Sequence, residues 1–135
     1  MSNRISALLI LALLSGCSDS SAENQLAAEK KTFASTAASV EMMAGEWLSG
    51  TVPHQFADRA LKAGNEELAD HMGRAATYMV RLQRDPQPLL QAMDAVLSSA
   101  AKTSADLSKE DYAALNVDFA QLKQAVANFR NRGGS

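Results

Sequence analysis

The chain has 135 residues, of which 13 are basic and 15 acidic, and its formal net charge is −2 at pH 7. This length suits one small domain, and the mildly acidic balance argues against a basic face that binds nucleic acid or anionic lipid. The single cysteine excludes a disulfide framework within the chain, so a folded domain must be stabilised by its core alone.

The N-terminal residues have the shape of a secretory signal. Arg4 supplies a positive charge, residues 5–14 form an apolar run interrupted only by Ser6, and two small residues precede Cys17. The apolar run is about half of the ~20 residues that a membrane span requires. We therefore interpret it as a cleaved signal peptide and not as a retained transmembrane helix.

The tetrapeptide Leu14-Ser15-Gly16-Cys17 resembles the lipobox of bacterial lipoproteins, in which the final cysteine carries the lipid. The resemblance implies cleavage after Gly16, a diacylglyceryl thioether on Cys17 and usually acylation of the new amino terminus. A thiolate is a suitable nucleophile for this modification, and two or more acyl chains give stable anchoring. The alternative is a soluble secreted protein with a stray cysteine near an ordinary cleavage site.

The lipobox divides the chain into a signal peptide (1–16), a short tether that begins at the lipidated cysteine (17–21), a helical domain (22–132) and a flexible tail (133–135). A few extended residues reach only about 10 Å, which predicts a domain held close to the membrane. Ser18 after the cysteine resembles lipoproteins sorted to the outer membrane, so we expect the domain to face the periplasm there.

A first helix is predicted from about residue 21 to 49. Ser20 and Glu23 have the spacing of a capping box, and Gly50 is a natural stop. The helix carries an apolar residue at every seventh position, interrupted on that side by Lys30, and the apolar residues are Leu26, Phe33, Val40 and Trp47.

A second helix is predicted from about residue 52 to 84, with Thr51 as its cap and Pro53 in its first turn. A single helix is the favoured interpretation, and a bend or break at Gly64 is the alternative. Its predicted inner face consists of Phe56, Leu61, Leu68, Met72, Ala75, Met79 and Leu82.

Asp85 and Pro86 predict the start of a third helix that ends near Thr103 and has an apolar face of Leu89, Leu90, Met93, Val96, Leu97 and Ala100. A fourth helix is predicted after Ser108, with Asp111 in a near-capping box and an apolar face of Tyr112, Leu115, Phe119, Leu122, Val126 and Phe129. Leu107 and Tyr112 are spaced like a hydrophobic staple. Four apolar stripes joined by short loops predict an all-α, up-and-down antiparallel four-helix bundle.

Helical bundles can bind metal ions or haem between their helices, and each kind of site requires its own set of ligands. Glu67 and His71 share one helix face, but two ligands make at most half of a metal site, and we interpret them as a polar pair at the core edge. A haem site could combine His71 with Met72 or Met79, although methionine in an apolar stripe is usually a core residue. The favoured prediction is no cofactor besides the lipid on Cys17, and a cofactor-binding bundle is the alternative.

Catalytic motifs give little support for an enzyme. The chain contains no Gly-x-Ser-x-Gly sequence, and lipidation would consume its one thiol. His54 and Asp58 could act as a base and its orienting group, which would make the protein a hydrolase. We interpret His54 instead as an exposed first-turn histidine beside a helix acid, and we predict that the protein is not an enzyme.

Large apolar residues gather around the first predicted turn, at Trp47, Leu48, Val52 and Phe56. One interpretation is that Trp47 closes the open end of the bundle. The other is that the cluster anchors a partner, because tryptophan commonly carries interface energy. The predicted function is a lipid-anchored module that binds a protein in the cell envelope or supports an envelope assembly, and an immunity or inhibitor protein is one specific version.

Overall fold

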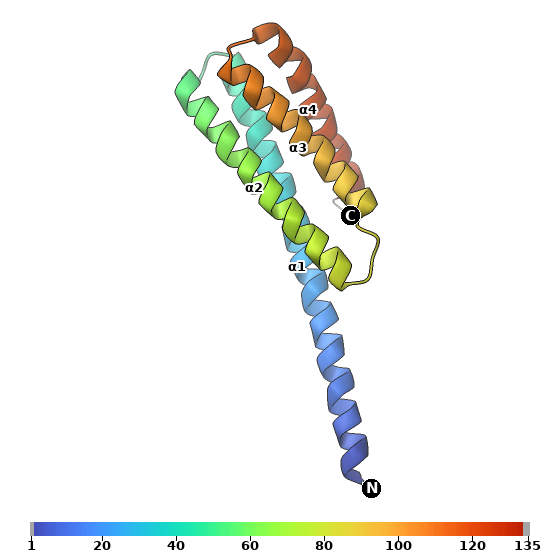
Figure 1. Cartoon of the computed structure of the whole chain (residues 1–135). Coiled ribbons are helices and arrows are strands. Elements are labelled where there is room, and N and C mark those ends of the chain that lie inside the picture. Colours follow the sequence, from blue (N-terminus) through green and yellow to red (C-terminus); the bar gives the residue numbers. More distant parts are fainter. Residues whose placement is uncertain (1, 134–135) are drawn as a thin grey trace.

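The computed structural model describes residues 2–133, with side chains for residues 20–132. The described part of the chain forms four helices and no strand: α1 (Ser2–Leu48), α2 (His54–Arg81), α3 (Gln87–Ser108) and α4 (Tyr112–Gly133). Neighbouring helices run antiparallel (Figure 1). The predicted all-α four-helix bundle is confirmed.

The bundle has two ends of different composition. At the distal end, as we call it, lie the connections from α1 to α2 and from α3 to α4. The proximal end contains the connection from α2 to α3, residues 22–30 of α1 and the C-terminal end of α4.

The apolar stripe of α1 is buried along its whole predicted length. Leu26, Phe33, Val40 and Trp47 are each at most 7% exposed, and Ala37 and Ala44 are fully buried between them. The rings of Phe33 and Phe129 lie 4.9 Å apart between centroids, which joins α1 to α4. Because α1 already runs through Ser20, the predicted capping box does not begin this helix.

The prediction of a single second helix is confirmed, since α2 is continuous from His54 to Arg81 and Gly64 does not break it. The role of Gly64 is instead to let α1 and α2 approach each other closely. A Cβ atom at position 64 would lie 2.5 Å from Cγ2 of Val40. A residue with any side chain would therefore push the two helices apart or force Val40 to move.

Replacing Gly64 with alanine should lower the free energy of unfolding by about 1–3 kcal/mol, because the stiff, branched Val40 side chain cannot turn away. The matched control is Gly73→Ala, where nothing lies within 4 Å of the added Cβ. That variant should gain about 0.5–1 kcal/mol from helix propensity. Urea unfolding followed by circular dichroism measures both changes.

A second experiment separates the contact from other effects of the substitution. In a Val40→Ala background the clash is gone, so Gly64→Ala should become stabilising, as Gly73→Ala is. If Gly64→Ala were as stable as Gly73→Ala in the native background, the close approach of α1 and α2 would be contradicted.

The same backbone motif ends α1, α2 and α3. Gly50, Gln83 and Glu110 have positive φ angles of 78°, 56° and 56°. Each donates its N–H to the carbonyl three residues earlier, and the next residue donates to the carbonyl five residues earlier. This is the Schellman motif, which satisfies carbonyls that a helix end would leave unpaired.

Several predicted caps were assigned to the wrong helix. The hydroxyl of Thr51 donates to the Glu46 carbonyl at the end of α1, and α2 starts after Pro53 without a side-chain cap. Ser108 is the last residue of α3, and the carboxylate of Asp111 instead accepts the N–H of Ala114 in the first turn of α4. The predicted capping box and staple at this turn are therefore wrong.

The start of α3 is predicted well, because the Asp85 carboxylate accepts the N–H of Gln87. Its end is not, since α3 continues five residues past Thr103 to Ser108. Thr103 and Ser104 are buried although they are polar. The hydroxyl of Thr103 donates to the Ser99 carbonyl at 2.7 Å, which satisfies it within its own helix and lets the apolar face continue to Leu107.

Substitution by glycine at Gln83 or Glu110 should raise the free energy of unfolding by about 1 kcal/mol each, because a Cβ disfavours positive φ. Gly50→Ala should lower it by about 1 kcal/mol, and since nothing lies within 4 Å of the added Cβ, the effect reports backbone strain alone. Thermal and urea unfolding measure these shifts. Glycine variants less stable than the native chain would contradict the assignment of the motif.

Candidate functional site

The rings of Trp47, Tyr112 and His54 form an aromatic cluster at the distal end of the bundle. Trp47 is the innermost of the three. Its ring stacks on that of Tyr112 from α4, with centroids 5.0 Å apart and an interplanar angle of 15°. The His54 ring from α2 meets it edge-on at 5.8 Å. Since Trp47 is only 7% exposed, it closes this end of the core, as the first interpretation of the sequence expects.

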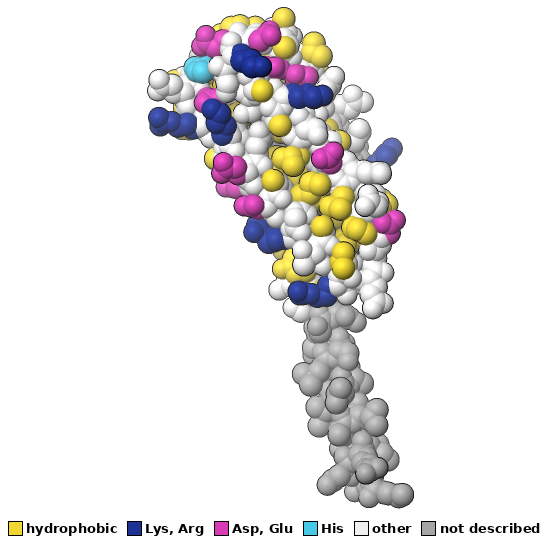
Figure 2. Space-filling model, in the orientation of Figure 1, with side chains coloured by type: hydrophobic (Ala, Val, Ile, Leu, Met, Phe, Trp, Pro, Cys, Tyr) yellow, Lys and Arg dark blue, Asp and Glu magenta, His cyan; other side chains and the backbone are white. Residues whose placement is uncertain are grey.

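Phe56 and Tyr112 lie at the surface of the same end, and both are 57% exposed. The sequence assigned both of them to inner faces, which is wrong. Leu48 and Val52 are partly buried against the core. Of the four residues proposed to anchor a partner, Phe56 alone is exposed. Tyr112 is also exposed at this end, but the sequence analysis did not propose it as an anchor. Figure 2 shows acidic and basic side chains around this end, with apolar side chains between them.

His54 and Asp58 lie close to each other but are engaged with different groups. Nε2 of His54 lies 2.8 Å from the carbonyl oxygen of Leu107, at the end of α3. The Asp58 carboxylate accepts hydrogen bonds from Lys62 and from Ser108 of α3, and these bonds hold its pKa below the usual value. Both side chains thus attach the start of α2 to the end of α3, which positions the aromatic cluster.

His71 contacts α1 and not the predicted partner Glu67. Its Nδ1 lies 2.5 Å from Oε2 of Glu29, whose Oε1 accepts a hydrogen bond from Arg74 at 2.9 Å. The side chains of His71 and Glu29 are 14% and 16% exposed, so this cluster is largely withdrawn from water. Glu29 falls three residues after Leu26 and four before Phe33, and this position on the apolar stripe was the signal that could have identified it.

Among the residues that the structure describes, no group of three or more His, Cys, Asp or Glu side chains could hold a metal ion. Met72 and Met79 are partly buried against the core. The described part of the chain contains no helix that is long and apolar enough to cross a membrane. Cys17 and the rest of the lipobox lie outside the described side chains.

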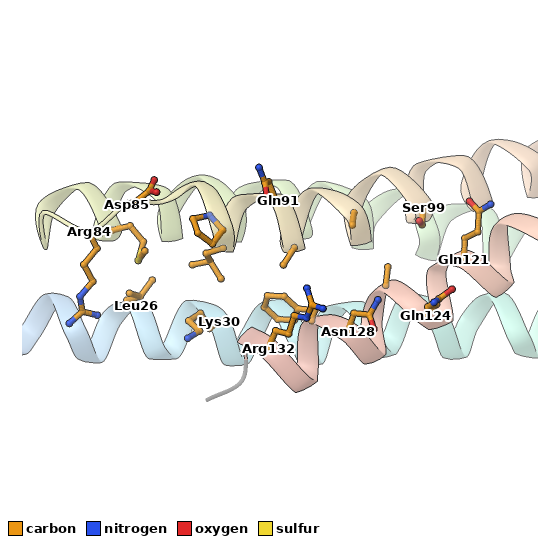
Figure 3. Close-up of a pocket in the computed structure, with 17 residues that line it drawn as sticks. Leu26, Lys30, Arg84, Asp85, Gln91, Ser99, Gln121, Gln124, Asn128 and Arg132 are labelled. Carbon is orange, nitrogen blue, oxygen red and sulfur yellow. The ribbon is translucent and has the colours of Figure 1, made fainter.

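A cleft opens at the proximal end, between α3 on one side and α1 with α4 on the other (Figure 3). Its volume is about 940 Å³. The apolar part of its lining consists of Leu26, Met79, Pro88, Leu89, Ala92, Ala95, Ala125 and Phe129. Its polar part consists of Lys30, Arg84, Asp85, Gln91, Ser99, Gln121, Gln124, Asn128 and Arg132. We call it the proximal cleft; no motif in the sequence predicted it.

Two carboxyl groups face each other across α3 and α4 near the distal end. The pKa of Asp106 is raised from 3.8 to about 6, mainly because the carboxyl group is buried. A hydrogen bond with Asp118 and charge repulsion from it raise this pKa further. With both groups ionised, the buried Oδ2 of Asp106 has no donor among the described residues. A proton shared between the two carboxyl groups supplies that donor, which is why the protonated form is favoured.

Comparison of the chain with protein-family models, with curated proteins and with solved structures finds no match in any of the three. The site must therefore be interpreted from its own geometry.

The raised pKa of Asp106 makes stability depend on pH. The folded state binds the proton more tightly than the unfolded state, so the free energy of unfolding should fall as pH rises from 3.8 to 6. Asp106→Asn keeps a donor toward Asp118 and should flatten this dependence, leaving the variant more stable than the native chain at pH 7. Urea unfolding across this range tests the prediction, with Asp94→Asn, an exposed position on α3, as control. Identical pH profiles for the native chain and Asp106→Asn would refute it.

Proposed function

We propose that the protein is a lipid-anchored module of a bacterial cell envelope that binds another protein through the distal end of its bundle. The observation that carries this proposal is the exposure of two aromatic side chains at the distal end, Phe56 and Tyr112, of which Tyr112 stacks on the buried Trp47. Aromatic residues on a rigid base are the usual anchors of protein interfaces, since they bury a large area at a small entropy cost.

The anchor is supported by the lipobox resemblance at Leu14-Ser15-Gly16-Cys17. A diacylglyceryl group on Cys17 would confine the domain to the membrane surface, with the proximal end of the bundle nearest the lipid. The distal end, where the aromatic side chains lie, would then face away from the lipid. Confinement raises the effective concentration of the domain near other envelope proteins, so that a modest interface is sufficient.

The rigidity of the distal end also supports a binding role. His54 and Asp58 attach α2 to α3 there, and the Schellman motifs at Gly50 and Glu110 fix the two connections. Exposed side chains on such a base are ordered before a partner arrives. Less conformational entropy is then lost on association than with a flexible loop.

The lipid anchor is tested by Cys17→Ser expressed in bacterial cells. The variant should lose incorporation of an alkyne-tagged fatty acid and should remain unprocessed or leave the membrane fraction, because a hydroxyl is a poor nucleophile at this step. Ser18→Ala is the control that keeps the cysteine and should still be labelled. Membrane retention and labelling of Cys17→Ser at the native level would contradict the anchor.

The partner surface is tested with a photoreactive amino acid placed at single positions in living cells. Position 56 should cross-link to one defined envelope protein, and Phe56→Asp should abolish that complex in co-purification. This substitution should change the stability of the fold by less than about 0.5 kcal/mol, since the side chain is exposed.

Val80, 65% exposed and near the C-terminal end of α2, provides the matched control position. Cross-linking to the same protein from position 80 and not from position 56 would move the interface away from the distal end. A complex unaffected by Phe56→Asp would have the same consequence.

A further inference from the structure

The proximal cleft lies between α3 and α4 and extends to α1 and to the connection from α2 to α3. The contact of Phe129 with Phe33 lies in the last turn of the described part of α4. Beyond it, α1 continues toward Leu26, and the connection from α2 to α3 passes above, with Arg84 and Asp85 on it.

The dimensions of the cleft suit a small, elongated molecule. Its wall on α3 runs from Pro88 to Ser99, which at 1.5 Å per residue is about 16 Å. A volume of about 940 Å³ falls in the range of small-molecule sites. The floor near Phe129 is formed by small and aliphatic side chains that would exclude water from a hydrocarbon chain.

The charge of the lining differs in sign from that of the whole chain. Three basic residues, Lys30, Arg84 and Arg132, and one acidic residue, Asp85, line the cleft of a protein whose net charge is −2. Arg84 is paired with Glu23 of α1. Arg132 lies beside the cleft near the end of α4, and the described residues offer it no ion pair (Figure 3). An anionic group entering the cleft would meet this guanidinium.

We propose that the proximal cleft binds a long-chain fatty acid. The hydrocarbon chain lies along the apolar lining between α3 and α4, and the carboxylate is bound by Arg132 with the amide of Asn128, one turn earlier on α4. This site is separate from the protein-binding surface at the distal end and requires neither that surface nor the lipid on Cys17.

The experiment uses the full chain in isolated membranes, with a palmitate analogue that carries a photoreactive diazirine in its acyl chain. Light-dependent labelling should map to peptides from α3 and α4 that line the cleft, and unlabelled palmitate should compete for it. Dependence on light and this location distinguish the label from any lipid on Cys17.

Two substitutions probe the two halves of the ligand. Ala95→Trp fills the cleft from an exposed position of α3, and Arg132→Gln removes the charge, so each should reduce labelling about ten-fold, the effect of roughly 1.4 kcal/mol. The controls are Ala105→Trp and Arg130→Gln, which are exposed on the same helices but do not line the cleft. Both controls should be labelled like the native chain.

Three results would overturn the proposal. The first is equal labelling of the cleft variants and their controls. The second is labelling by a photoreactive phosphatidylglycerol but not by the fatty acid, which would assign the cleft to a membrane phospholipid. The third is a cross-link from a photoreactive residue at position 95 to a second copy of the chain, which would make this face a protein interface.

Discussion

The close contact between α1 and α2 is the constraint on which the rest of the bundle depends. These two helices make the most extensive contact in the structure, and at Gly64 their separation is set by the absence of a side chain opposite Val40. A stripe of apolar residues along α1 fills the seam from Leu26 to Trp47. Helices α3 and α4 then pack as a second pair over this surface, and a core with no disulfide is complete.

The two ends of that seam have different properties. At the distal end the core is closed by Trp47, which stacks on Tyr112, and the side chains of Tyr112 and Phe56 reach solvent. At the proximal end α3 and α4 leave a cleft between them, which reaches Leu26 and Lys30 of α1. One bundle thus presents exposed aromatic side chains at one end and a partly apolar cleft at the other.

Polar groups inside the bundle are arranged between helices more than along them. Glu29 of α1 reaches His71 and Arg74 of α2, and Asn65 of α2 donates to the Ala100 carbonyl of α3. Sequence reasoning paired neighbours four residues apart on one helix, such as Glu67 with His71, since only those distances are known before folding. For the same reason it gave Thr51 and Ser108 to the following helix, whereas each hydroxyl contacts the helix before it or one across the bundle.

The sequence by itself determined the four helices and most of the buried residues, because periodicity of apolar side chains is a local property that a buried stripe must satisfy. It also supplied the lipobox, on which the proposed anchor rests. Only the tertiary structure decided that Phe56 and Tyr112 are exposed while Trp47 is buried, that Gly64 marks a close crossing, and that a cleft remains beside the end of α4. Each of these depends on the relative lengths and axial positions of helices distant in sequence, and no single segment encodes that information.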